Sequence, residues 1–357
     1  EYEMQFQVHK RLILVVGLLL IAISSHAQQV IKLTAATGHP NVLLWVKALD
    51  EVFLSEIDKR LAVDGRYRIE WTKAWGGTLL KLGSESKGYA DGVADLGLTL
   101  TVFEAPKFPL HNVSYFTPFG STDIALVDKT VADLQSQIPA MNDIWARNNL
   151  VYLGGIALEN YQIFTKFPLN RIEDLQGKKI SAPGPAANWI KGTGAVAVSG
   201  NLNTYYEDLK SGVSDGVVVF GTAANAIKLH EVAPYLTQVN FGAMFCGGVT
   251  VNKRRFDRLP EEVQKAMREA GKVYSSAYAK AQNEATVTSL KSMVTAGLKV
   301  SDFSEAERKR WADSLSPVAK TWADELEQKG MPARKVLNGY MEAMNKSNAK
   351  IPRDWSK

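Results

Sequence analysis

The feature of this sequence that most constrains its fold is a regular alternation of β-branched runs with segments of helical apolar spacing. The run VIKLTAAT (30–37) precedes a helical segment (40–59), and the strand YRIEWTKAW (67–75), a helix (78–92) and the strand ADLGLTLTVF (94–103) follow. This βαβαβ order predicts a parallel sheet with helices on both faces. We therefore expect an α/β protein.

The alternation continues and then repeats on a smaller scale. A helix at 131–149, which Pro139 should kink, leads into two strands within 150–166. The shorter strands and helices of 171–240 predict a second α/β unit, and GGVTVNK (247–253) predicts a strand that returns to the first sheet. A chain that crosses more than once between two α/β units is typical of two-lobed hinge proteins.

One helix is expected to be much longer than the rest. Between Pro260 and Ala296 no further proline interrupts the chain, and Val263, Met267 and Tyr274 keep helical spacing. A continuous helix over this stretch would be about 55 Å long, which exceeds one lobe, so it could underlie both lobes. Two further helices are predicted after it, at 305–330 and 333–346.

The first residues predict an export signal. A basic start at Lys10 and Arg11 precedes the apolar run LILVVGLLLIAI, which is too short to span a bilayer, and small residues flank the peptidase site that ends at Ala27. We expect residues 1–27 to be a cleaved signal peptide that directs the chain to the periplasm. Retention of the apolar run as a membrane anchor is the alternative.

Charge and cysteine content exclude some classes of protein. The net charge of +5 is spread thinly, without the basic block typical of nucleic-acid binding, so no nucleic-acid partner is expected. Cys246 is the only cysteine, so an internal disulfide cannot form. Export without disulfides fits a bacterial periplasm.

Catalytic, cofactor and metal motifs do not emerge from the sequence. The Gly-Lys-Lys step at Gly177 lacks the upstream glycine and the following Ser or Thr of a phosphate loop. The segment GTGAVA (192–197) has dinucleotide-fingerprint spacing, but helix-like residues precede it and a strand-like run follows, which reverses the required order. The histidines have no metal-ligand spacing. We expect a binding protein with no catalytic residues, metal or cofactor.

His39 is the histidine best placed for a ligand, because it follows the first strand, where an open sheet binds ligands at its switch point. A simple turn residue is the alternative. Asp91 and Asp95 flank a Gly-Val-Ala turn and could mimic a carboxylate pair, but a solvated turn and strand cap explain them better.

Two segments carry a family resemblance. RIEDLQGKKISAPG (171–184) and YYEDLKSGVSDGVVVF (205–220) resemble the substrate-binding proteins of TRAP transporters, the tripartite periplasmic family that supplies organic acids to a sodium-driven permease. The strand order, the LPEEVQKAMREAG opening of the long helix and the signal peptide agree with this family. The similarity extends over essentially the whole mature chain.

The resemblance implies a two-lobed periplasmic binding protein fold whose long helix bridges both lobes. It also implies TRAP permease membrane subunits as partners and no catalysis. We expect residues 28–158 with 246–284 to form lobe I, residues 159–245 with 285–357 to form lobe II, and the protein to be a monomer. A ligand sensor that docks on a signalling receptor is the alternative to a transport protein.

The arginine clamp with which the family usually holds a carboxylate is missing. Family members carry the first arginine of this clamp in a Lys-Ile-Arg strand, and Ser181 stands at its position here. A second arginine, common in sialic-acid-binding members, is replaced by Tyr161. In the family a polar residue often follows the Asp-Gly step, here at 215–216, and Val219 occupies that position in this chain. Lys178 and Lys179 alternate around the strand and do not replace the clamp by register.

The expected site combines apolar walls with a few uncharged polar groups, which is typical of a small-molecule pocket. Hydroxyls, Asn188 and the backbone N–H groups that begin the helix at residue 186 could hold an acid there. We expect a small organic acid, a monocarboxylate more apolar or aromatic than a C4-dicarboxylate. The predicted ligand-binding residues are His39, Trp75, Thr99, Thr101, Phe103, Tyr161, Ser181, Asn188, Trp189, Val219 and Phe220, with Leu100 and Leu202 at the cleft edges.

Overall fold

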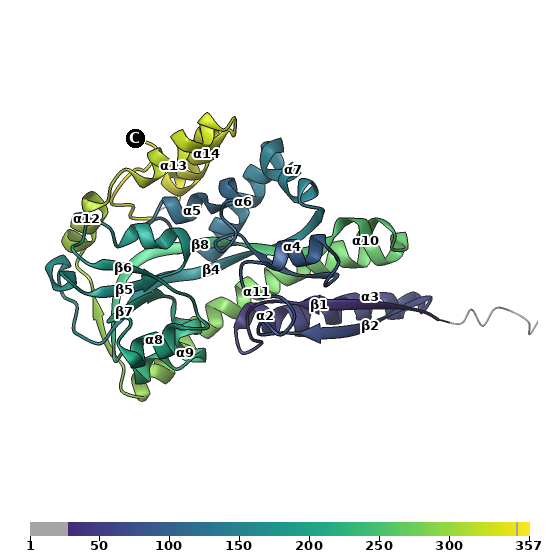
Figure 1. Ribbon diagram of the computed structural model, residues 1–357, viewed down its shortest axis with the longest axis horizontal. Helices are drawn as coiled ribbons and strands as arrows, with labels where there is room; N and C mark the ends of the chain where they lie inside the picture. The colour runs from purple at the N-terminus through teal and green to yellow at the C-terminus, as the bar shows by residue number, and fades with distance from the viewer. Residues whose placement is uncertain (1–27, 348) are drawn as a thin grey trace, which may run out of the picture.

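The computed structural model describes residues 28–347 and 349–357, and the predicted signal peptide lies outside the described residues. In this part of the chain a nine-stranded sheet forms the centre of the protein (Figure 1). The strands are β1 (Gln29–Ala36), β2 (Tyr67–Ala74), β3 (Leu96–Leu100), β4 (Leu150–Thr165), β5 (Lys179–Ala182), β6 (Val196–Ser199), β7 (Gly216–Val219), β8 (Tyr235–Asn252) and β9 (Lys299–Asp302).

The strand order β2-β1-β3-β8-β4-β7-β5-β6 joins two parallel units, a first unit of β1–β3 and a second unit of β5–β7. β1 is parallel to β2 and β3, and β5 is parallel to β6 and β7. Between the units, β8 is antiparallel to β3 and β4, and β4 is antiparallel to β7, while β9 pairs with β8 in parallel. The predicted parallel alternation is confirmed within each unit, and the strands that connect the units are antiparallel.

The connecting strands β4 and β8 are 16 and 18 residues long, about 50 to 60 Å, so each runs through both lobes. The structure therefore has one bulged strand where the sequence predicted two. A register shift between Leu158 and Tyr161 divides β4 into two parts. The part before the shift pairs with the C-terminal half of β8, and the part after it pairs with the N-terminal half of β8 on one side and with β7 on the other. Bulges bend a strand, which suits a junction between lobes. The lobe boundaries at 158/159 and 245/246 stay a prediction.

The helix α11 (Glu261–Thr295) confirms the predicted long helix, at 35 residues and about 52 Å. It contacts β4 and packs against α3 (Ser55–Asp64) on the first unit and α9 (Gly221–Ala226) on the second, so it bridges both lobes (Figure 1). Gly271 allows the close approach to β4, because a Cβ there would overlap the Leu153 carbonyl oxygen. The two-lobed α/β fold with a bridging helix is thus confirmed.

Three helix predictions were wrong in their extent. The segment 131–149 is not one kinked helix: α6 (Ile124–Gln137) ends before the extended Ile138, and α7 (Pro139–Arg147) begins with Pro139, which cannot donate the hydrogen bond of a helix interior. Pro317 likewise divides 305–330 into α12 (Glu305–Ser314) and α13 (Val318–Gln328). Only α4 (Glu85–Ala90) is helical within 78–92.

Helices cover both faces of the sheet. α5 (Val113–Phe116), α6 and α7 lie on the side opposite α11, and α13 with α14 (Ala333–Lys346) packs against α5 and α6 there (Figure 1). No helix in the described part of the chain is both long and apolar enough to cross a membrane. The remaining helical segments are α2 (Leu44–Ala48), η1 (Leu49–Leu54), η2 (Pro109–Asn112), η3 (Ile172–Leu175), η4 (Gly184–Trp189), α8 (Tyr205–Ser211), η5 (Leu229–Glu231) and α10 (Lys253–Asp257).

Candidate ligand-binding site

A cavity of about 20 Å³, which holds about one water molecule, is lined by side chains from both parallel units and from the connecting strands. None of these described lining residues is Lys, Arg, Asp or Glu. The lining residues are His39, Trp45, Leu100, Val102, Phe103, Leu158, Tyr161, Pro183, Leu202, Tyr205, Val218, Val219, Phe220 and Cys246.

The cavity lies beyond the carboxyl ends of the parallel strands, where open α/β sheets bind ligands. His39 follows β1, Phe103 follows β3, Pro183 follows β5 and Phe220 follows β7. Strand direction therefore brings residues far apart in the sequence to one place. This is the position that the sequence predicted for His39.

His39 is the most polar side chain on the wall of the cavity. It is 1% exposed, and its ring packs edge-on against Trp45 and Phe103, at centroid distances of 5.5 and 5.9 Å. Neither ring nitrogen has a hydrogen-bond partner among residues 28–347 and 349–357, and the indole N–H of Trp45 has none either. Burial lowers the pKa of His39 to about 3, so the imidazole is neutral at physiological pH.

The other polar groups of the cavity are neutral as well. The hydroxyls of Tyr161 and Tyr115 share a hydrogen bond of 3.1 Å, and the Tyr161 ring meets Phe220 edge-on at 5.0 Å. Burial raises the pKa of Tyr161 and of Tyr205 above the ordinary phenol value and raises the pKa of the Cys246 thiol to about 12. The lining therefore carries no charge at neutral pH.

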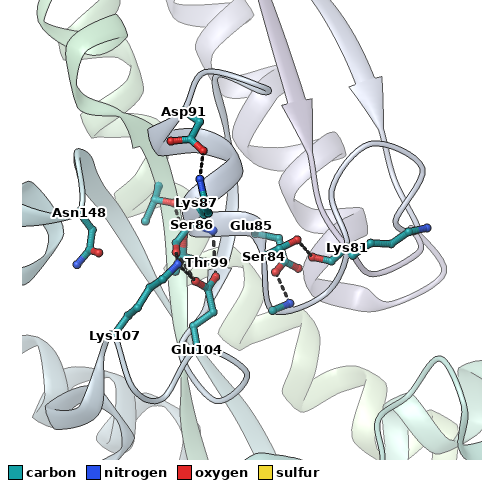
Figure 2. A network of polar contacts seen from close by, with 12 residues as sticks. Lys81, Ser84, Glu85, Ser86, Lys87, Asp91, Thr99, Glu104, Lys107 and Asn148 are labelled. Atoms are coloured by element: carbon teal, nitrogen blue, oxygen red, sulfur yellow. Dashed lines mark hydrogen bonds and ion pairs between the residues drawn. The ribbon is translucent and has the colours of Figure 1, made fainter.

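A buried polar network holds the backbone beside this wall (Figure 2). The Glu85 carboxylate, at the start of α4, accepts hydrogen bonds from the N–H of Gly38 at 3.2 Å and of Gly83 at 2.6 Å. Burial raises the pKa of Glu85 to about 7. Next to it, Glu104 accepts the backbone N–H of Ser86 and the Lys107 ammonium, both at 3.0 Å. One helix thus anchors the residue before His39 and the loop that carries Phe103.

Five of the predicted ligand-binding residues come together at the cavity. These are His39, Phe103, Tyr161, Val219 and Phe220, and Leu100 and Leu202 lie with them.

Three of the predicted polar residues have partners elsewhere. The Thr99 hydroxyl shares a hydrogen bond of 2.7 Å with Thr250 within the sheet, and the Ser181 hydroxyl on β5 pairs with Ser214, which lies just before β7. Asn188 accepts from the Lys191 ammonium at 2.9 Å on the surface.

The predicted aromatic residues Trp75 and Trp189 do not line the cavity either. Trp189 is buried and stacks on Tyr115 and Phe241, while its indole N–H donates to the Tyr115 carbonyl at 2.7 Å. Trp75 is half-buried in the turn after β2. Thr101 is fully buried beside the cavity residues Leu100 and Val102 without lining it.

Sequence reasoning missed half of the lining. The apolar residues of the strands and of α2 looked like ordinary core, although Tyr205 stands in one of the motifs that carried the family resemblance and could have been found there. The missed residues are Trp45, Val102, Leu158, Pro183, Tyr205, Val218 and Cys246.

Known proteins share this sequence pattern and this fold. A solute-binding protein of Albidiferax ferrireducens is 25% identical over 285 residues, which span 76% of this chain and 79% of its own. A marine metagenome TRAP solute-binding protein, specific for pyroglutamate, superposes with a TM-score of 0.76 at 22% identity, covering 88% of this chain and 99% of that one. A TRAP solute-binding protein of Rhodoferax ferrireducens T118, in complex with copurified benzoate, gives a TM-score of 0.77 at 18% identity, covering 88% and 98%.

The family model described as bacterial extracellular solute-binding protein, family 7, matches residues 37–325, which is most of the chain. The match includes both motifs that carried the resemblance and the long helix α11. Members of this family are transport receptors, which agrees with the expectation that the chain is not an enzyme. The chain therefore belongs to bacterial extracellular solute-binding protein family 7, the DctP family of TRAP periplasmic solute-binding proteins.

Proposed function

We propose that this protein captures a small monocarboxylic acid with an apolar or aromatic body and delivers it to the membrane subunits of a TRAP transporter. The ligand binds between the lobes, in the cavity lined by His39, Tyr161 and Phe220. Because the cavity volume is about 20 Å³, the two lobes must separate to admit such a molecule.

The observation that carries this proposal is the absence of any charged side chain from the described lining residues. A dicarboxylate would bring two charges into this wall, and each unpaired buried charge costs several kcal/mol. An aromatic or branched body instead gains contact with Trp45, Phe103 and Phe220, because apolar burial is worth roughly 25 cal/mol per Å². The lining thus selects for an apolar body with at most one acidic group.

Some proteins of the same fold support this substrate class. Benzoate and pyroglutamate, the molecules bound by two of them, are small monocarboxylates, whereas others hold galacturonate or glucuronate, monocarboxylates with hydroxylated bodies. Family membership supports the TRAP permease as the partner, because such receptors supply a membrane transporter. The basic and apolar start of the sequence supports export, and we expect a periplasmic chain that begins at Gln28, which mass analysis of a periplasmic fraction would show.

A thermal-shift screen tests the proposed function. A ligand at 100 times its Kd adds about 2.7 kcal/mol to the free energy of unfolding, which raises Tm measurably. We expect benzoate and other monocarboxylates with an apolar body to raise Tm, and the dicarboxylate succinate and the hydroxylated monocarboxylate glucuronate to leave it unchanged. If succinate or glucuronate gave the larger shift, the proposed substrate class would be wrong.

A further inference from the structure

Two buried rings on the wall of the cavity, His39 and Trp45, carry polar atoms without a hydrogen-bond partner. Both nitrogens of His39 and the indole nitrogen of Trp45 have no hydrogen-bond partner in the described chain, although both residues are at least 98% buried. A buried polar group without a partner is costly, so native proteins rarely retain one without a role. The ring centroids of His39 and Trp45 are 5.5 Å apart, so these polar atoms belong to two rings in direct contact on one wall of the cavity.

The groups around His39 offer no charge to neutralise such an acid. Tyr161 on β4, Tyr205 on α8 and Cys246 on β8 stay protonated, since burial raises the pKa of each. On α4, the Glu85 carboxyl bonds to the N–H of Gly38, and burial raises its pKa to about 7, so it is mostly neutral below pH 6.5. A carboxylate that entered alone would be an unpaired charge among these groups, which is strongly unfavourable.

We propose that the ligand carboxylate enters this cavity together with one proton from water, that the His39 imidazole holds this proton against the carboxylate, and that the Trp45 indole N–H donates to the other oxygen. This inference rests on the proposed function, because it needs a monocarboxylic acid as the ligand. It assigns to His39 and Trp45 the task that an arginine clamp performs in related proteins.

The proton is held between His39 and the ligand, because a negative charge in direct contact with an imidazole favours its protonated form. In the free protein burial lowers the pKa of His39 to about 3, and a carboxylate in contact restores the charged form. Between pH 5 and 6.5, therefore, the free imidazole is neutral and the free acid is ionised, while the complex carries one additional proton. The proton comes from the buffered solvent and forms an N–H bond on the imidazole, and no other covalent bond changes.

Calorimetric titration with two probes tests this coupling. The Kd for benzoate should rise about tenfold for each pH unit between pH 5 and 6.5, and titration in buffers of different ionisation enthalpy should report uptake of close to one proton. Benzamide has the same body and no acid, so its Kd should stay constant over this range. A pH-dependent Kd for benzamide would show that Glu85, and not His39, controls the site, and it would overturn the inference.

Two histidine variants separate His39 from the rest of the protein. His39→Gln keeps a polar side chain that does not titrate, so its Kd for benzoate should be at least tenfold higher than wild type at pH 5 and nearly independent of pH. His111→Gln is the matched control, because His111 is also buried with a lowered pKa but lies outside the cavity, against Gln135 and Trp145. The Kd of His111→Gln for benzoate should rise with pH as steeply as that of the wild-type protein.

The outcomes distinguish this inference from the proposed function. If benzoate binds without proton uptake, or if His39→Gln keeps the wild-type slope, the proposed function stands and the role of His39 is wrong. If neither benzoate nor any other monocarboxylate binds to the wild-type protein at any pH, the proposed function fails. Trp45→Phe should raise the Kd for benzoate by up to about tenfold and leave its pH dependence unchanged, as expected for the loss of a second donor. An unchanged Kd would remove Trp45 from the site.

Discussion

Replacing His39 by leucine should stabilise the ligand-free protein, and increasingly so at acidic pH. At pH 7.5 the change removes two buried nitrogens without partners and keeps a side chain of similar size, so we expect the free energy of unfolding to rise by about 1 to 3 kcal/mol. Most substitutions of buried residues destabilise, so a gain of this size would mark His39 as a functional residue and not as core.

The effect of pH follows from the lowered pKa of His39, about 3 in the folded protein against 6.5 in the unfolded chain. Because the unfolded chain binds more protons below pH 6.5, the contribution of His39 to stability is full above that pH and is lost as the pH falls toward 3. At pH 5 the loss amounts to about 2 kcal/mol. His39→Leu does not suffer this loss, so its advantage over wild type should grow by about 2 kcal/mol between pH 7.5 and pH 5.

Urea unfolding of both proteins at pH 7.5 and pH 5, after removal of ligand by unfolding and refolding, measures this difference. The lowered pKa of His111 also reduces the free energy of unfolding as the pH falls. Glu85 and Asp128 have the opposite effect, because burial raises their pKa values to about 7 and about 6. These groups are common to both proteins and cancel in the comparison. A difference that does not change with pH would refute the desolvated, neutral imidazole on which the account of the site depends.

Three further predictions concern the support of the cavity. Trp189→Ala should lower the free energy of unfolding by about 3 to 5 kcal/mol, because Trp189 packs at the centre of an aromatic cluster, whereas the exposed control Lys309→Ala should change it by less than about 0.5 kcal/mol in urea unfolding. Ser181→Arg should reduce Tm and soluble yield and confer no binding of succinate in calorimetry, because its fully buried position offers a guanidinium no partner; a stable variant that binds succinate would contradict the placement of Ser181. Gly38→Ala should weaken benzoate binding at least tenfold, because the new Cβ would lie 2.5 Å from Leu82 Cα and displace the loop before His39; unchanged affinity would show that this loop is free to move.

The alternation of strands and helices and the proline-free run after Pro260 predicted two α/β units and one long helix, and the family resemblance added that this helix bridges the two lobes. The alternation and the proline-free run are properties of local spacing, which the sequence displays directly. The first twelve residues of β8 (235–246) were not predicted as a strand, because YLTQVNFGAMFC mixes polar, glycine and apolar residues without a period of two. Pairing with β4 and β9 makes this part of the chain a strand.

The candidate site was predictable only where position along a strand sufficed. His39, Phe103 and Phe220 follow the carboxyl ends of strands, and that position is readable from sequence. The prediction for Ser181 depended on the face of β5 to which its side chain points, and on that face its hydroxyl pairs with Ser214. A missing hydrogen-bond partner, the property that distinguishes His39 and Trp45, depends on neighbours distant in the sequence, so no spacing rule could have predicted it.

Competition for the ligand-free protein tests the central claim most directly. Native mass spectrometry of the protein in an equimolar mixture of benzoate, succinate and glucuronate at pH 6 weighs the complex that forms. We predict a complex of one protein with one benzoate, because benzoate joins a single acidic group to an apolar body, whereas succinate has two carboxyl groups and glucuronate has a hydroxylated ring that this uncharged, mostly apolar lining does not match. A predominant complex with succinate or glucuronate would contradict the account.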